Sequence, residues 1–330
     1  MLLQSCLDPT LAMYRRLRDA DREARLIVGP WNHTSGFNDD MPIIFGEALR
    51  WLRAHLTADG DLSPRPVRVH VGAIGAAGRW RDLADWPPTD ARPVLWRLNA
   101  DGTLTADSQR DDSQRDDSQR DDSQRDDSQR DDSQRDDSQR DDSGEPRDAG
   151  GSVSSFRYDP ARPTPSVGGP SMDARSAGPR RNNALEARDD VLIFTSEPLR
   201  EPVEVIGPVG VRLRVRGSSP HFDIFARLCD VDSGGRSWNV CDGLVRLSDG
   251  AAWTEITAAM SSTAHRFGAG HRLRVQLSGG AHPRFARNTG TGEPIATATR
   301  LARVEIEVDH GRDCVVSLPV VPALGLFHHV

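Results

Sequence analysis

Residues 209–215 read Val-Gly-Val-Arg-Leu-Arg-Val, an alternation of apolar side chains with glycine and arginine that decides the fold of most of the chain. Alternation at every second residue is typical of a strand with one face on a core and the other in water. The same pattern recurs at residues 272–277 and 303–308, and clusters of Gly, Pro and Asp separate such segments. The sequence after about Pro88 therefore predicts an antiparallel, all-β sandwich.

Upstream of Pro88 the pattern is that of an α/β fold. The pair Asp8-Pro9 predicts the start of a helix, because aspartate is a good N-cap and proline suits the first helical position. Residues 26–28 form a short apolar run typical of a buried strand, and residues 45–56 follow as an amphipathic helix. With an alternating strand at residues 67–71, this order predicts the end of a parallel sheet.

The chain of 330 residues is long enough for two domains, which we place at residues 1–88 and 89–330. The second contains an insertion at residues 106–145, in which the unit DDSQR occurs six times in tandem from Asp111 to Arg140. The unit has no apolar residue and matches neither the helical nor the strand period, so it predicts a disordered segment. An acidic interaction tail is one interpretation. A tandem duplication tolerated in a surface loop is the simpler one.

The net charge of -7 comes from this insertion, whose 16 acidic and 7 basic side chains leave the other 290 residues at +2. A nearly neutral globular part does not match the basic surface of a nucleic-acid-binding protein. No apolar run approaches the ~20 residues that span a bilayer, and the N-terminus shows no signal-peptide pattern, so we expect a soluble cytoplasmic protein with no membrane partner. All 42 basic residues are arginine, which excludes lysine-based catalysis.

Metal and cofactor chemistry is not indicated, and we expect no cofactor. The four cysteines form no CxxC pair and show no metal-ligand spacing with histidine, so we expect core thiols in a reducing compartment and no zinc site. Four aspartates of the second domain suggest a calcium site, but their spacing does not match an EF-hand loop, and turn residues between strands are the simpler interpretation. They are Asp223, Asp230, Asp232 and Asp242.

One histidine is a candidate for catalysis, but the sequence has no nucleophile motif. No G-x-S-x-G segment, which forms the nucleophile elbow of α/β-hydrolases, occurs in the 330 residues. His33 follows the strand at 26–28 through a turn at 29–32, and the catalytic histidine of an α/β-hydrolase lies on such a loop after a late strand. From spacing alone, a loop histidine without a catalytic role is the simpler interpretation.

Several ordered motifs resemble one family of hydrolases. Residues 24–33, Ala-Arg-Leu-Ile-Val-Gly-Pro-Trp-Asn-His, resemble the G-P-W-x-H segment of the cocaine-esterase-like (CocE/NonD) and X-Pro dipeptidyl-peptidase hydrolases. Residues 158–169 are similar to the family's Y-D-P-x-x-P-x-P-S-x-G-G. Further matches lie at residues 78–80, 86–87, 188–192, 195–199, 241–243 and 268–273. The resemblance extends over nearly the whole chain apart from the repeat.

This resemblance implies the end of an α/β-hydrolase domain followed by a jelly-roll (galactose-binding-like) β-sandwich of the X-Pro dipeptidyl-peptidase C-terminal type. It implies a Ser-Asp-His triad that cleaves esters or amides through an acyl-enzyme, with His33 as the general base. The match covers only the C-terminal part of such proteins, so we expect the nucleophile and the oxyanion donors upstream, outside this sequence. Asp8, 25 residues before His33, is the nearest candidate for the triad acid, although a helix cap is its simpler role.

Three tryptophans have two interpretations. Trp31, Trp80 and Trp86 line an acyl pocket near His33 in the first, and fill the junction of the two domains in the second. The second is simpler, because large aromatic side chains dominate such junctions.

The sequence therefore predicts the C-terminal part of a serine hydrolase for acyl esters or X-Pro peptide bonds. Triad members act as a unit, so we expect the chain alone to be inactive. Its expected partners are a small ester or peptide substrate in the complete enzyme and an N-terminal segment supplied in trans. The alternative from a different class is a non-catalytic β-sandwich that serves binding or oligomerisation, the relic of a split gene or pseudogene.

Overall fold

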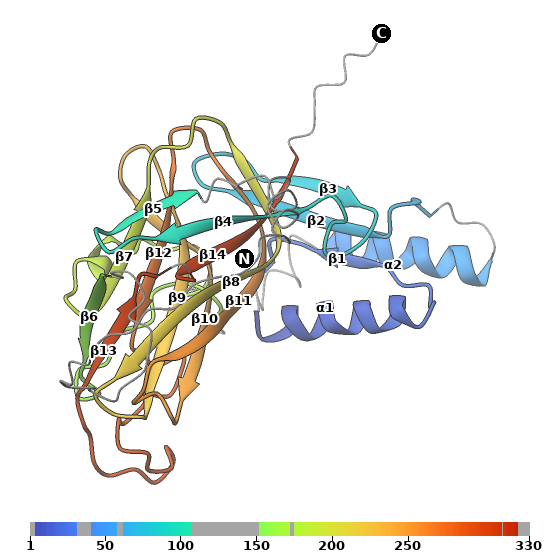
Figure 1. The fold of residues 1–330 in the computed structure, drawn as a ribbon. Helices are drawn as coiled ribbons and strands as arrows, with labels where there is room; N and C mark the ends of the chain where they lie inside the picture. The colour runs from blue at the N-terminus through green and yellow to red at the C-terminus, as the bar shows by residue number, and fades with distance from the viewer. Residues whose placement is uncertain are drawn as a thin grey trace, which may run out of the picture.

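The computed structural model describes residues 4–31, 41–57, 62–106, 152–171, 175–311 and 313–322, and it is mostly strand (Figure 1). Two helices and three strands come first along the chain: α1 (Gln4–Asp19), β1 (Leu26–Val28), α2 (Met41–Leu56), β2 (Val67–Ala73) and β3 (Arg79–Leu83). The remaining elements are β4 (Arg92–Leu98), β5 (Thr103–Ala106), β6 (Val153–Tyr158), α3 (Asn183–Glu186), β7 (Val191–Ser196), β8 (Val203–Gly217), β9 (Phe222–Val231), β10 (Ser237–Leu247), β11 (Thr254–Phe267), β12 (Arg272–Ser278), β13 (Val304–Asp309) and β14 (Val315–Val321).

Strand β8 confirms the alternation of buried and outward-facing side chains predicted for residues 209–215. Val209, Val211, Leu213 and Val215 are buried, and the arginines between them point away from the core. β8 pairs antiparallel with β11, β13 and β14. From there the hydrogen-bonded order continues through β14, β4, β5, β7, β12, β9 and β10. One hydrophobic cluster joins side chains from both ends of this path, which makes the body of the protein a β-sandwich.

The first elements form a smaller layer beside the sandwich. β1 and β2 pair in parallel, with Leu26 opposite Val67, and α2 lies between them in the sequence. β2 continues into the sandwich, because its last residues pair with β11 at His265 and Arg266. Its alternate residues Val67, Val69 and Val71 are buried in a second cluster with α1. The predicted order of helix, strand, helix and strand is therefore present, and it packs against one end of the sandwich (Figure 1).

The predicted start of the first helix, with Asp8 as its cap and Pro9 as its first residue, is wrong. α1 begins at Gln4, four residues before Asp8, so Asp8 is not its cap and Pro9 lies inside the helix. The physical reason is packing: Leu7, Leu11 and Tyr14 lie on one face of α1 and contact the second cluster, which favours helix upstream of the Asp-Pro pair.

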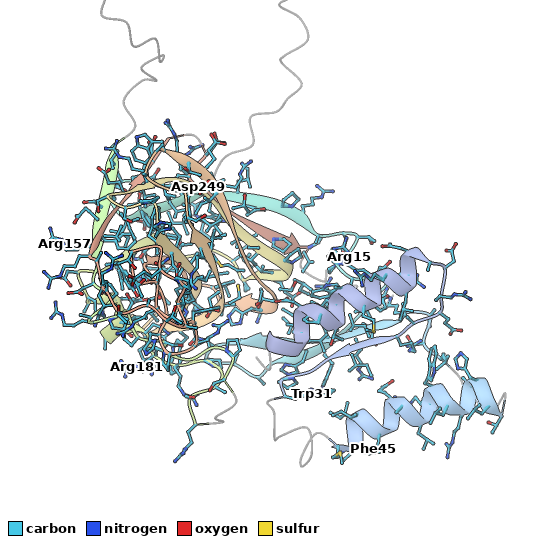
Figure 2. All side chains as sticks on the ribbon, turned by 90° about the horizontal axis from the view of Figure 1, so that it is seen from below. Arg15, Trp31, Phe45, Arg157, Arg181 and Asp249 are labelled. Atoms are coloured by element: carbon cyan, nitrogen blue, oxygen red, sulfur yellow. The ribbon has the colours of Figure 1, made fainter. Side chains whose placement is uncertain are left out.

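The apolar stripe of α2 is exposed rather than packed on a core. No side chain of α2 is buried, and Figure 2 shows this helix standing apart from the sandwich, with Phe45 near its start. The exposed fractions of Phe45, Leu49, Leu52 and Leu56 run from 48% to 76%. An ion pair from Glu47 to Arg68 of β2, at 3.0 Å, connects α2 to the layer.

The predicted insertion lies outside the described residues, apart from Ala106 at the end of β5. The strands on either side of it are each held by other strands: β5 pairs with β4 and β7, and β6 pairs with β13. Among the described residues, no helix is long and apolar enough to cross a membrane.

Deletion of Asp111 to Arg140 should leave the free energy of unfolding within about 1 kcal/mol of the full chain. The flanking strands keep their own partners, and the entropy of closing a loop depends only weakly on its length. Urea denaturation followed by circular dichroism measures the change. A shorter deletion of Asp111 to Arg125 is the matched control. A cooperative loss of fold in either protein would contradict the prediction.

The sandwich also contains a fully buried ion pair between neighbouring strands. Arg227 of β9 lies directly opposite Asp242 of β10, and both side chains have no exposed surface. Two guanidinium nitrogens of Arg227 donate to Oδ2 of Asp242, at 2.9 and 3.2 Å. The third donates to the carbonyl oxygen of Val167, at 2.6 Å, and to Asn182. Oδ1 of Asp242 pairs with Arg284, so every polar atom of the pair is matched, as burial of a charge requires.

Arg227→Met should lower the free energy of unfolding by about 3 to 5 kcal/mol, because it leaves a buried carboxylate short of its partner. The matched control is Arg157→Met. Arg157 projects from the outer edge of the sandwich (Figure 2) and makes an exposed cross-strand pair with Glu305, so its loss should cost less than about 1 kcal/mol. Urea denaturation of both variants checks the contrast, and equal losses would show that burial does not set the strength of the pair.

Candidate functional site

The end of β1 leads to the predicted catalytic histidine. β1 ends at Val28, and Gly29, Pro30 and Trp31 follow it. His33 lies outside the described residues, so its role as general base stays a prediction. The structure describes the surroundings of Gly29, Pro30 and Trp31, which precede His33 in the sequence.

An aromatic cluster covers the exit from β1. The indole of Trp31 lies over Gly29, where a Cβ atom would fall 1.3 Å from the indole nitrogen, so only glycine fits below this ring. Trp31 packs edge to face on Trp80, with the ring centroids 6.3 Å apart. Trp80 in turn packs edge to face on the imidazole of His70, with the ring centroids 5.4 Å apart. The guanidinium of Arg68 lies over the Trp80 ring. This accounts for the glycine and the tryptophan of the G-P-W-x-H segment.

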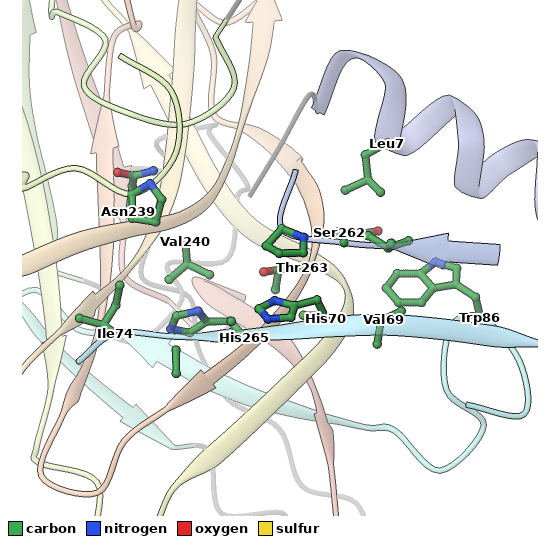
Figure 3. Close-up of a pocket in the computed structure, with 17 residues that line it drawn as sticks. Leu7, Val69, His70, Ile74, Trp86, Asn239, Val240, Ser262, Thr263 and His265 are labelled. Atoms are coloured by element: carbon green, nitrogen blue, oxygen red, sulfur yellow. The ribbon is translucent and has the colours of Figure 1, made fainter. Parts of the chain in front are cut away.

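A cavity of about 160 Å³ lies beside the same exit, between β1, β2, β10 and β11 (Figure 3). Its wall is mostly apolar and includes Val28, Pro30, Val69 and Val240. Of the three tryptophans, only Trp86 lines it, and Trp86 also belongs to the second hydrophobic cluster. The structure therefore separates the predicted trio: Trp31 and Trp80 pair with each other, while Trp86 lies at the cavity.

Asp8 connects α1 to the sandwich. Its carboxylate accepts a hydrogen bond from the Ser261 hydroxyl, at 3.0 Å, and one from the backbone N–H of Ser262, at 3.5 Å. Both partners lie in β11, 253 and 254 residues away along the chain. The assignment of Asp8 as triad acid stays a prediction, because His33 is outside the described residues.

Sequence reasoning missed a buried carboxylate bonded to two histidines, one of which lines the cavity. Asp230 of β9 is fully buried and accepts two hydrogen bonds of 2.8 Å, from Nε2 of His265 and from Nδ1 of His271. His265 lines the cavity and is buried on the same face of β11 as Phe267. The signal in the sequence is this spacing of two residues, which places His265 on the inward face of a strand.

The four aspartates considered as turn residues have different roles. Only Asp232 lies in a turn, where it accepts from the backbone N–H groups of Gly234 and Arg236. The turn interpretation is wrong for Asp223, Asp230 and Asp242, which lie inside strands and are buried. Each faces a cationic or imidazole side chain: Arg246 for Asp223, the two histidines for Asp230, and Arg227 with Arg284 for Asp242.

The described part of the chain holds no group of three or more His, Cys, Asp or Glu side chains placed to bind a metal ion. Cys229, Cys241 and Cys314 are buried free thiols. Burial raises the pKa of Cys229 and of Cys314 to about 12, and that of Cys241 well above its ordinary value. Since the thiolate is the nucleophile, these three thiols are inert at neutral pH.

The tether between α1 and β11 should be measurable as a coupling energy. Asp8→Ala and Ser261→Ala should each cost about 1 kcal/mol or less, and a double-mutant cycle should give a coupling of roughly 0.5 to 1 kcal/mol. Asp19→Ala, at the other end of α1, is the matched control and should show no coupling to Ser261→Ala. Thermal unfolding of the four proteins measures the cycle. Strict additivity of Asp8→Ala and Ser261→Ala would mean that the contact contributes nothing.

Comparisons with known proteins agree with this architecture. Residues 62–313 match the family model of the X-Pro dipeptidyl-peptidase C-terminal non-catalytic domain. Cocaine esterase of Rhodococcus sp. (strain MB1 Bresler) is 30% identical over 300 residues, which cover 83% of this chain and 46% of that protein. The chain spans about half the length of the curated relatives it matches.

Solved structures share the fold. An aminopeptidase from the marine sediment archaeon Thaumarchaeota archaeon superposes with a TM-score of 0.72 at 18% identity, over 94% of this chain and 52% of that one. An α-amino acid ester hydrolase superposes with a TM-score of 0.67 at 20% identity, over the same shares of the two chains. The resemblance found in the sequence is confirmed. The chain belongs, through its C-terminal non-catalytic domain, to the cocaine-esterase-like (CocE/NonD) and X-Pro dipeptidyl-peptidase family of serine hydrolases.

Proposed function

We propose that the chain is the C-terminal part of a serine hydrolase that cleaves acyl esters or X-Pro peptide bonds, with His33 as the general base of a Ser-Asp-His triad. The observation that supports this most is the course of the chain at β1. β1 and β2 are parallel, and the G-P-W-x-H segment follows the carboxyl end of β1. In α/β folds the loops at the carboxyl ends of parallel strands carry the active site.

The same proposal divides the chain into two domains. Residues 1–88 are the end of an α/β-hydrolase domain, and residues 89–330 are a jelly-roll domain. The parallel pair of β1 and β2 supports the first assignment, and the antiparallel pairing of β8 with three strands supports the second.

The nucleophile and the oxyanion donors then come from outside these 330 residues. The 330 residues contain no G-x-S-x-G segment, and the described thiols are inert. The exposed apolar side chains of the two helices offer a surface for it: Met13 and Leu17 on α1, and Phe45, Leu49, Leu52 and Leu56 on α2. Exposed apolar patches of this kind are typical of surfaces that another part of a protein covers. The chain alone is therefore inactive.

A second candidate function is a non-catalytic binding module. It is favoured by the match to a family model that is itself described as a non-catalytic domain, and by a cavity lined by described residues of α1, β1, β2, β10 and β11. The two functions differ in what happens when a catalytic portion is added.

The first test is labelling with a fluorophosphonate probe, which reacts with an activated serine. The chain alone should show no labelling. Adding the N-terminal portion of cocaine esterase, in trans or as a fusion, should produce labelling and hydrolysis of a p-nitrophenyl ester. Stoichiometric labelling of these 330 residues alone would overturn the assignment of the nucleophile to a part of the protein outside them. No gain on addition would favour the binding module.

The second test addresses His33 in the reconstituted enzyme. His33→Ala should lower kcat by several orders of magnitude with little change in KM, the pattern for an interaction made in the transition state. His55→Ala is the matched control, because His55 of α2 is exposed and bonded to Glu23. If His33→Ala kept more than a tenth of the activity, a loss below about 1.4 kcal/mol in the barrier, His33 would not be the general base.

A further inference from the structure

We propose that the cavity between β1, β2, β10 and β11 is a binding site for a small neutral ligand, about the size of one aromatic ring, that carries a hydroxyl or amide N–H donor. The inference does not rest on the proposed function, because the wall of the cavity belongs to this chain and binding needs no hydrolysis.

The size and lining of the cavity set the body of the ligand. Its volume is about 160 Å³. An engineered protein cavity of about 150 Å³ lined by Leu, Ile and Phe binds benzene, so a single ring fits. Here Leu7, Val28, Val69 and Trp86 provide the apolar wall. Such a wall with a few placed polar groups is typical of small-molecule sites.

Alongside His70 of β2, three polar side chains of β11 line the cavity and indicate the functional group of the ligand. Ser262, Thr263 and His265 all line it and are at most 9% exposed (Figure 3). Within the described part of the chain, the two hydroxyls and Nδ1 of His265 make no hydrogen bond. Because these residues line the cavity and these atoms make no hydrogen bond within the described residues, a ligand with a matching polar group can bond to them. The side-chain amide of Asn239, by contrast, is already hydrogen-bonded to Arg180, Asn182 and Gly178.

Asp230 fixes the chemistry that His265 offers. Because the Asp230 carboxylate accepts from Nε2 of His265, the neutral ring carries its proton on Nε2 and presents a lone pair at Nδ1. The ligand must therefore bring a donor. The second acceptor contact of Asp230, with Nδ1 of His271, holds the carboxylate from the other side and so keeps the ring of His265 in place. A carboxylate ligand would place a negative charge against this lone pair and near the Asp230 carboxylate, so a neutral donor is favoured over it.

The experiment uses the full chain and three probes of similar size: benzyl alcohol, toluene and benzoate. Isothermal titration calorimetry and ligand-detected NMR should show saturable binding of benzyl alcohol with one site per chain. Toluene, which lacks the donor, and benzoate, which brings a negative charge, should each bind at least tenfold more weakly. If benzyl alcohol does not saturate, or if toluene binds as tightly as benzyl alcohol, the proposal is wrong.

Two variants test the location of the site. A Cβ atom at Gly72 would lie 3.8 Å from Nδ1 of His265, an ordinary contact, so Gly72→Ala covers that nitrogen without a clash. It should weaken benzyl alcohol binding at least tenfold at unchanged thermal stability. Thr263→Val keeps the shape of the side chain, removes the hydroxyl and should weaken the binding several-fold. The matched control is Thr257→Val on the exposed face of β11, which should leave binding unchanged. Unaltered affinity in both Gly72→Ala and Thr263→Val would place the ligand elsewhere and overturn the proposal.

Discussion

The complete burial of β9 is the constraint on which the rest of the sandwich depends. All ten of its residues are buried, and three of them are aspartate or arginine with charged or hydrogen-bonded partners: Asp223, Arg227 and Asp230. A charge removed from water must be matched where it lies, since an unpaired one costs several kcal/mol. β9 can therefore lie inside the sheet only if neighbouring elements place complementary polar groups beside these three residues.

Those groups come from elements that are distant in sequence, and they fix how the sheets meet. Asp242 of β10 forms an ion pair with Arg227, and the carbonyl oxygen of Val167 accepts a further hydrogen bond from the same guanidinium. The motif that ends in Gly168-Gly169 owes its glycines to this network: Gly169 has a φ of +83°, and a Cβ atom there would lie 3.1 Å from Asp242 Oδ2. Gly169, which reads as a loop signal in the sequence, thus leaves space for a buried carboxylate.

How much of this could be predicted from the sequence follows from the range of each interaction. The alternation at 209–215 and the apolar run at 26–28 predicted β8 and β1, because one face of a strand is a local property. The Asp8-Pro9 pair misled, because contacts of Leu7 with a distant core override a cap preference of about 1 kcal/mol. The aspartates of β9 and β10 misled for the same reason: aspartate is a turn residue by propensity, and only the partners across the sheet make it a core residue.

The cavity shows why a site can escape sequence reasoning although every residue in it is visible. Its polar side is built by a chain of three positions, Asp230 on β9, His265 on β11 and Gly72 on β2, and no two of them are close in sequence. Asp230 must be paired because β9 is buried, and this requirement orients His265. β2 then reaches the same place because it joins the parallel layer to the edge of the sandwich at Gly72, where the lack of a side chain leaves Nδ1 of His265 uncovered. The exit of β1 also contributes to the wall through Val28 and Pro30, and Pro30 is three residues before His33 in the sequence. The same burial requirement that holds the sandwich together therefore places an oriented histidine beside the segment that carries the predicted general base.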